Sequence, residues 1–260
     1  TMIGRMLEKI GGTILSVSQA TGEMLKLLWQ TIFYFKEAPR NLPAIFKQMS
    51  DIGIDTLPIA ALLAFFVGMV LALQTGTQLA LYGTQNVIGA IVGLSMVKEL
   101  GPVMTSMLVA GRVGSSMAAE IGAMKVYEEI DALKTLEINP VRYLAMPRMI
   151  ACLLAVPAIT VFSIIIGILG GGLISSVTPV INVPFSVYFD NMVQVLGYIE
   201  IFKGLLKAFV FGGIIAHVGC YVGFQTTGGA RGIGRATTRA VVMAFLLIMV
   251  ADYFLTRITL

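Results

Sequence analysis

The strongest constraint on this chain is a long stretch without charge. From Thr56 to Val97 no side chain is charged, and the seventeen residues from Leu57 to Leu73 have no polar side chain either. As a helix, such a stretch is long and apolar enough to cross the hydrocarbon core of a bilayer. Charged residues make up only 12% of the 260 residues, against about 25% in soluble domains. The sequence therefore predicts an integral membrane protein.

Four further apolar stretches raise the prediction to about five spans. They cover about Val87–Gly111, Met149–Ile174, Gly204–Gly223 and Ala240–Thr256. Because a bilayer offers backbone amides no water, each span is expected to be an α-helix. We predict an all-α integral membrane protein whose membrane domain covers residues 51–260.

Between the third and fourth spans, apolar residues recur every three or four positions after Pro184. This spacing predicts a short helix lying in the outer membrane interface; its apolar residues are Phe185, Tyr188, Phe189, Met192, Val193 and Leu196.

Residues 1–50 form a separate amphipathic region. They hold six Lys or Arg residues and no apolar run of span length. Their spacing predicts a helix in the membrane interface, with Trp29 at headgroup level. A cytosolic helix packed on a partner is the alternative. The apolar positions are Met2, Met6, Leu7, Ile10, Ile14, Leu25, Leu28, Trp29, Ile32 and Phe33.

The placement of basic residues predicts the orientation. With the N-terminus inside, fourteen Lys and Arg residues face the cytoplasm, while Lys203, Lys207 and Arg257 face outward and Lys98 stays within the membrane. The excess of positive charge favours a cytoplasmic N-terminus and an outer C-terminus.

Two polar features interrupt the apolar spans. The segment Gln74–Asn86 is polar and uncharged and contains Gly76 and Gly83, which favours a broken helix lining a cavity over an ordinary outer loop. Lys98 and Glu99 lie near the centre of span two, where a charge costs roughly 2.5–3.5 kcal/mol. Such residues mark a substrate pathway, or they neutralise each other or contact backbone between spans.

The loop from Arg112 to Arg148 is predicted to contain one amphipathic helix, from Gly114 to Leu136. Its apolar stripe comprises Met117, Ile121, Met124, Tyr127, Ile130, Leu133 and Leu136. Its polar faces carry Glu120, Lys125, Glu128, Glu129, Asp131, Lys134 and Glu137. The helix could dock a soluble partner or lay its stripe on the protein's own spans. Glu128 and Glu129 are adjacent, so they do not converge as a catalytic pair.

The glycine-rich loop Thr226–Arg239 does not form a nucleotide-binding motif. Thr237 occupies the place of the last glycine in G-x-G-x-x-G, and the sequence has no P-loop. If helical, Arg231, Arg235 and Arg239 share one face, which would suit inner-leaflet phosphates or an acidic partner. A simple topology anchor is the alternative.

The sequence contains no recognisable motif for an enzyme active site or a metal site. The sequence has neither H-E-x-x-H nor G-x-S-x-G. Cys152, Cys220 and the single His217 lie in apolar runs, and are expected to pack rather than to bind metal. We expect neither catalysis nor a cofactor bound by this chain.

Several long motifs in order resemble the MlaE (YrbE-type) permease family over about residues 55–255. They are Gly68-Met-Val-Leu-Ala-Leu-Gln74, Lys98-Glu-Leu-Gly-Pro-Val103, Ala110-Gly-Arg-Val-Gly-Ser-Ser-Met-Ala-Ala-Glu-Ile-Gly-Ala-Met-Lys125, Glu129-Ile-Asp-Ala-Leu133, Asn139-Pro-Val-Arg142 and Gly232-Ile-Gly-Arg-Ala-Thr-Thr-Arg239. Residues 1–50 match in general character only.

The resemblance implies the permease of an ABC transporter in the bacterial inner membrane, moving phospholipid and maintaining outer-membrane lipid asymmetry. It implies a homodimer, a separate cytoplasmic ATPase that binds ATP and Mg, a periplasmic MCE lipid-binding protein and often a STAS-domain protein. No nucleic acid is implied.

The resemblance also assigns residues. The family's ATPase-coupling helix matches Glu120–Leu136, and its lipid cavity at the dimer interface matches Gln74, Leu79, Tyr82, Lys98 and Glu99. The family often has Arg where this chain has Lys98, so bidentate binding of phosphate there is not expected. In the expected mechanism Tyr82 and Lys98 meet the headgroup, and Glu99 holds Lys98 in place. The alternatives are an autonomous ion-coupled carrier or channel using the Lys98/Glu99 pair, and a membrane scaffold without a transport path.

Overall fold

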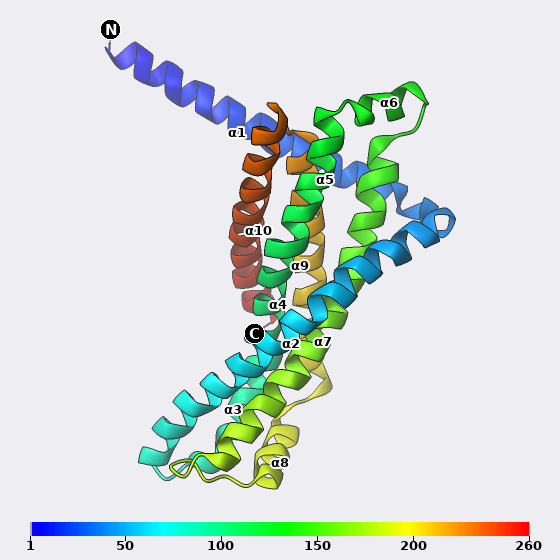
Figure 1. The fold of residues 1–260 in the computed structure, drawn as a ribbon. Coiled ribbons are helices and arrows are strands. Elements are labelled where there is room, and N and C mark those ends of the chain that lie inside the picture. Colours follow the sequence, from blue (N-terminus) through cyan, green and yellow to red (C-terminus); the bar gives the residue numbers. More distant parts are fainter. Residues whose placement is uncertain (1, 260) are drawn as a thin grey trace.

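The computed structural model describes residues 2–259, with side chains described at residues 12 and 15 and from residue 18 onward. It is helical throughout, and no β-strand occurs within residues 2–259 (Figure 1). The elements are α1 (Met2–Phe33), η1 (Tyr34–Asn41), α2 (Leu42–Leu81), η2 (Gln85–Val87), α3 (Ile88–Ser95), η3 (Met96–Leu100), α4 (Gly101–Val109), η4 (Ala110–Gly114), α5 (Ser115–Val126), α6 (Glu129–Thr135), η5 (Val141–Ala145), α7 (Met146–Val177), α8 (Phe185–Val195), α9 (Tyr198–Phe224) and α10 (Gly229–Thr259).

The number of spans agrees with the sequence prediction. Within the described residues, five helical segments are long and apolar enough to cross a membrane: Ser18–Leu81, Gln85–Val126, Val141–Val177, Tyr198–Phe224 and Gly229–Thr259. The chain is a multi-pass membrane protein.

The helix α2 packs along α7 through a row of small residues. Its buried positions Ala60, Ala64, Gly68, Ala72 and Gly76 recur every fourth residue. A Cβ atom on Gly68 would overlap the carbonyl group of Gly167 in α7. Small residues bring two helix backbones close together, which is how helices gain packing energy in lipid.

The same row explains why the expected break at Gly76 is wrong. Gly76 is buried against Ile88 and Ile181, and α2 continues without interruption to Leu81. The chain leaves the helix after Leu81 and turns at Gly83, whose φ of 67° is a left-handed conformation that glycine adopts without strain. Gly76 is therefore a packing residue, and most of the polar segment is helical.

The second span extends far beyond its apolar stretch. The helices from α3 to α5 follow one another directly, with π-helical turns at η3 and η4, so the segment runs on to Val126. The next span begins with η5 at Val141. The predicted long loop from Arg112 to Arg148 is therefore wrong, because both spans continue as helices past the end of their apolar residues.

The predicted single helix from Gly114 to Leu136 is also wrong. The chain turns at Tyr127 and at Glu128, which has a φ of 61°, before α6 begins. The stripe lies largely on the protein's own spans: Met117 and Ile121 are buried in α5, and Ile130 joins Ile121 and Leu144 in one cluster. Met117 and Ile121 pack where α5 lies along α9. The chain must then turn so that Ile130 of α6 can reach the same cluster.

The short helix predicted between spans three and four is α8, and it packs on α3 and α7. Tyr188 is fully buried, and its hydroxyl donates to the carbonyl of Ile168 at 3.2 Å. A Cβ atom on Gly89 of α3 would overlap the carbonyl of Tyr188. In Figure 1 this group, with the end of α2, lies at the far end of the molecule from α6.

The N-terminal region is helical, as predicted. In α1, Leu27 and Thr31 are buried, while Leu25, Trp29 and Phe33 expose more than half of their surface. The side chains of Met2, Met6, Leu7, Ile10 and Ile14 lie outside the described residues. Hydrogen bonds join α1 to the end of α9: the Tyr221 hydroxyl donates to the carbonyl of Ala20 at 3.1 Å, and Nε2 of Gln225, the residue after α9, donates to Glu23 Oε2 at 2.7 Å.

Candidate functional site

The single turn of π-helix η3 carries both charges that interrupt span two. Such turns occur often at functional sites, because the extra residue changes where the side chains point. The turn lies close to α9, since a Cβ atom on Gly204 would overlap the carbonyl of Val97. The glycine thus brings the first turns of α9 against Lys98 and Glu99.

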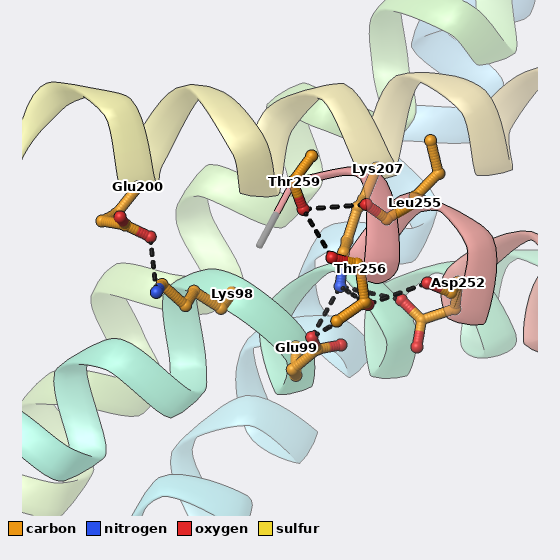
Figure 2. Close-up of polar contacts among 8 residues, drawn as sticks. All are labelled: Lys98, Glu99, Glu200, Lys207, Asp252, Leu255, Thr256 and Thr259. Atoms are coloured by element: carbon orange, nitrogen blue, oxygen red, sulfur yellow. Dashed lines mark hydrogen bonds and ion pairs between the residues drawn. The ribbon is translucent and has the colours of Figure 1, made fainter.

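Glu99 belongs to an ionic network centred on the buried Lys207 of α9 (Figure 2). Lys207 Nζ lies 2.7 Å from Glu99 Oε1 and 3.0 Å from Asp252 Oδ1 of α10, and donates to Thr256 Oγ1 at 2.8 Å. Thr256 also donates to Glu99 at 3.2 Å. Because only 3% of the Lys207 side chain is exposed, these three partners replace the water that an ammonium group would otherwise bind. We call Glu99, Lys207, Asp252 and Thr256 the Lys207 network.

Lys98 points to a different partner. Its Nζ lies 2.7 Å from Glu200 Oε2 at the start of α9, and Lys203 Nζ lies 3.8 Å from the other oxygen of that carboxylate. Figure 2 shows this pair to one side of the Lys207 network. The prediction that Glu99 holds Lys98 is therefore wrong. Consecutive helical side chains diverge by about 100°, so each member of the pair meets its own partner on α9.

Together these groups are electrically balanced. Lys98, Lys203 and Lys207 face the carboxylates of Glu99, Glu200 and Asp252. Exposure separates the lysines rather than the two sets of partners: Lys98 keeps 40% of its side-chain surface and Lys207 only 3%, while Glu99 is 41% exposed. The enclosed Lys207 ammonium can hold three helices together, and the exposed Lys98 can exchange its partner.

The other predicted cavity residues lie at the end of α2. Tyr82 is 80% exposed and Gln74 is also exposed, while Leu79 is half-buried and packs against the cluster around Ile88 and Tyr188. In the described part of the chain, no hydrogen bond or ion pair joins Gln74 or Tyr82 to the η3 charges. A single copy therefore leaves these side chains outside the network.

The predicted coupling residues divide between α5 and α6. Glu120 on α5 accepts from Ser116 at 2.8 Å and pairs with the buried Arg148 of α7 at 2.8 Å. It therefore joins two spans, although the sequence placed it on a docking surface.

On α6, Asp131 pairs with Lys134 at 2.7 Å and with Lys125 at 3.1 Å. These hydrogen bonds, that of Lys134 first, lower the pKa of Asp131 below its ordinary value. Leu133 is half-buried against the cluster of Ile121 and Ile130. Glu128 and Glu129 are exposed beside it. The short helix α6 is therefore held in place by its packed apolar side chains and presents carboxylates to solvent.

The three loop arginines lie on the first turns of α10. Arg231, Arg235 and Arg239 are exposed and recur every fourth residue, so they share a face. A cavity of about 310 Å³ between the end of α9 and the start of α10 is lined by Arg235 and Arg239 together with Thr226 and Thr227. No carboxylate lies within ion-pair distance of these arginines among the described residues.

Comparison with known proteins decides the family. The family described as Permease MlaE matches residues 45–258. The chain belongs to the MlaE permease family. The matched range contains η3, the Lys207 network, α6 and the arginines of α10.

Similar proteins cover nearly the whole of this MlaE-family chain. A probable ABC transporter permease of Rickettsia typhi is 38% identical over 99% of this chain and 98% of its own length. One from Synechocystis is 40% identical over 88% of this chain and 87% of its own length. The intermembrane phospholipid transport system permease protein MlaE of Haemophilus influenzae is 32% identical over 99% of this chain and 98% of its own length. The similarity thus extends into residues 1–50, beyond the range that the motifs indicated.

Sequence reasoning missed three members of the Lys207 network in this permease, Lys207, Asp252 and Thr256. Lys207 was only counted among the basic residues on the outer side of the membrane, whereas its side chain is buried between α9 and α10. Asp252 was passed over, although it is the sole charged residue between Ala240 and Thr256. A lone acid in one span and a lysine within another already indicate a pair, because an isolated charge in a bilayer is costly.

The described residues do not bring together a candidate metal site. No group of three or more metal-ligating side chains comes together there. Cys152 and Cys220 are free and buried, so they pack as the sequence predicted.

Proposed function

We propose that this chain is the membrane subunit of an ABC transporter that moves phospholipid between the bacterial inner membrane and a periplasmic MCE lipid-binding protein, in maintenance of outer-membrane lipid asymmetry. The observation that carries the proposal is the half-open ionic site at η3. Lys98 there is exposed enough to reach a phosphate, while the enclosed Lys207 holds Glu99 of the same turn. The phospholipid named in the Haemophilus influenzae relative supports the choice of substrate.

In the proposed mechanism, Lys98 exchanges Glu200 for the lipid phosphate. Lys203 lies 3.8 Å from the other oxygen of Glu200, so it can move onto the carboxylate that Lys98 leaves. The site stays neutral apart from the incoming phosphate, which limits the cost of exchanging partners in a low-dielectric medium. Lipid tails would occupy the apolar space outside η3, and Tyr82 and Gln74 would meet the lipid from a second copy of the chain in a homodimer.

The proposed orientation places α6 and the start of α10 in the cytoplasm, and α8 with the end of α2 on the periplasmic side. The N-terminus is then cytoplasmic and the C-terminus periplasmic. The α6 end carries Lys125, Lys134 and the three loop arginines, and the positive-inside bias favours placing such an end in the cytoplasm. In this arrangement residues 1–50 form an interfacial region, and residues 51–260 the permease domain.

ATP-driven motion would enter through α6. A separate cytoplasmic ATPase that binds ATP and Mg would contact the exposed carboxylates of α6, with a STAS-domain protein beside it. Gln85–Val126 is one helical segment that contains η3, and α6 follows its end after the turn at Tyr127 and Glu128. From Lys98 to Val126 that segment measures roughly 42 Å at 1.5 Å per residue. A tilt applied at α6 would therefore reach Lys98 and its partners.

The test is lipid transfer in a reconstituted complex. Vesicles containing this chain and its ATPase are mixed with the MCE protein, and ATP-dependent transfer of labelled phospholipid is measured for Lys98→Ala, Lys98→Arg and Lys203→Ala. We expect Lys98→Ala to lose most transfer and Lys98→Arg to retain it. Wild-type transfer by Lys98→Ala would remove Lys98 from the lipid path.

Two other outcomes would replace the proposal. Gradient-driven ion flux through the chain alone would favour an autonomous carrier or channel. Assembly of the full complex without any lipid transfer would favour a scaffold.

A further inference from the structure

An apolar groove shares no lining residue with the Lys98 site, and the proposed transport path does not use it. It is enclosed by α1 and η1 on one side and by α7 and α9 on the other, with a volume of about 440 Å³. Leu28 and Phe35 line it from the N-terminal region, Leu153 from α7 and Phe209 from α9. Every lining residue except His217 is apolar or glycine. Its volume lies within the range of about 300 to 1,000 Å³ that is usual for small-molecule sites.

His217 gives this groove one polar group. Its side chain lines the groove and the residue is only 8% exposed. Its Nδ1 is buried and has no hydrogen-bond partner in the described part of the chain. Buried polar groups normally have partners, so an unpartnered one calls for an explanation such as a missing ligand. A ligand that is apolar along most of its length and has oxygen acceptors or hydroxyls at one point would fit this lining.

The size of the groove favours a chain over a helix. One turn of an α-helix with its side chains is about 10 Å wide and 5.4 Å high, which is roughly 420 Å³. A partner's transmembrane helix would therefore fill the groove with a single turn and leave the rest of its length outside. A flexible acyl chain can lie wholly within it. Because α7 and α9 are membrane spans, acyl chains are the molecules that surround them.

The charges beside the groove favour an anionic headgroup. Glu37, the one carboxylate of η1, is paired with Arg142 at 2.7 Å. Lys36 and Arg40 of η1 then have no ion-pair partner in the part of the chain with described side chains. Lys36 follows Phe35 directly, and its Nζ lies 3.7 Å from the ring centroid of Phe33. Basic residues at a membrane surface attract anionic lipids.

We propose that this groove binds one acyl chain of an anionic phospholipid, with His217 contacting its glycerol or ester oxygens and its phosphate beside Lys36 and Arg40. The site retains a resident lipid that fastens α1 to α7 and α9. It rests on the proposed placement of α1 at the membrane surface, and it does not depend on transport of lipid by the Lys98 site.

The experiment uses the full chain, purified with any subunits that accompany it, in vesicles containing phosphatidylglycerol with a photoactivatable acyl chain. Adducts are mapped by mass spectrometry. Adducts at the exposed α10 residues Leu246 and Val250 report ordinary contact with bulk lipid. We expect groove adducts to be competed away by a small fraction of unlabelled phosphatidylglycerol, and α10 adducts to fall only in proportion to dilution.

Variants separate the parts of the site. In Gly213→Leu the new Cβ atom lies 3.3 Å from Leu153 Cδ2, and the leucine side chain fills the groove. Groove adducts should therefore be lost, while α10 adducts remain. The pair Lys36→Gln and Arg40→Gln, which changes exposed residues only, should abolish the advantage of phosphatidylglycerol over phosphatidylcholine as competitor. His217→Phe keeps a ring and should weaken competition by phospholipid more than competition by a simple alkane.

Three results would overturn the inference. The first is groove labelling that follows bulk-lipid labelling in every variant. The second is equal competition by both phospholipids in the wild-type chain. The third is a cross-link from the groove to a partner's membrane helix. Failure of lipid transfer by Lys98 variants would leave this site unaffected, so the two proposals fail separately.

Discussion

Removing the Lys207 ammonium should destabilise the helix bundle strongly, because this buried group on α9 pairs with Glu99 of η3 and Asp252 of α10. Lys207→Met keeps a similar unbranched side chain but leaves Glu99 and Asp252 without their shared cation. Breaking a buried ion pair on one side costs about 3–5 kcal/mol. Glu99 is 41% exposed and can turn toward a polar surface, whereas Asp252 is 18% exposed. We therefore expect the lower end, about 3 kcal/mol, or roughly two orders of magnitude in the unfolding equilibrium.

The assay is reversible unfolding of the purified chain in mixed detergent micelles, followed by circular dichroism. Lys203→Met is the matched control, since Lys203 lies 3.8 Å from Glu200 and is 28% exposed. It should cost no more than about 1 kcal/mol, as half-open pairs do. Adding Asp252→Asn to Lys207→Met should recover part of the loss, because it removes a carboxylate that had lost its partner. Wild-type stability of Lys207→Met, or a further loss on adding Asp252→Asn, would refute the reasoning.

Three further predictions concern packing, coupling and pH. Gly68→Ala should destabilise by roughly 1–3 kcal/mol, because its Cβ would overlap the Gly167 carbonyl. Gly53→Ala, in the same helix but with no atom within 4 Å of its Cβ, should be neutral or stabilise by up to about 1 kcal/mol in the same unfolding assay, and equal effects would contradict the close contact. Arg148→Ala should loosen α5 from α7, because it leaves Glu120 without its partner at 2.8 Å; hydrogen exchange should rise in α5, and unchanged exchange would show that the pair does not hold the helices. The pKa of Asp131 is lowered by Lys134 and Lys125, so its contribution to order in α6 is present above the ordinary pKa of an aspartate and is lost as pH falls through that value and below. Hydrogen exchange of α6 should therefore increase on acidification in the wild type, and should not change over that range in Asp131→Asn.

The membrane character of the chain could be predicted from the sequence because it depends on local composition. A run such as Leu57–Leu73 has no stable place in water, and lipid requires it to satisfy its own amides as a helix. The same reasoning gave the number of spans and the short helix α8. The family was also readable, because long motifs around Lys98, Arg112 and Asn139 occur in order.

What the tertiary structure alone decided is which side chains meet. Lys98 and Glu99 are neighbours in the chain, yet their partners Glu200 and Lys207 come from a helix about a hundred residues later. Helix ends were equally hidden, since α2 passes through Gly76 and α5 continues to Val126 under the influence of packing on α7 and α9. Periodicity states which face of a helix is apolar, but it does not state which other helix covers that face. Ion pairs between spans depend on that choice, and they are therefore fixed only when the helices pack.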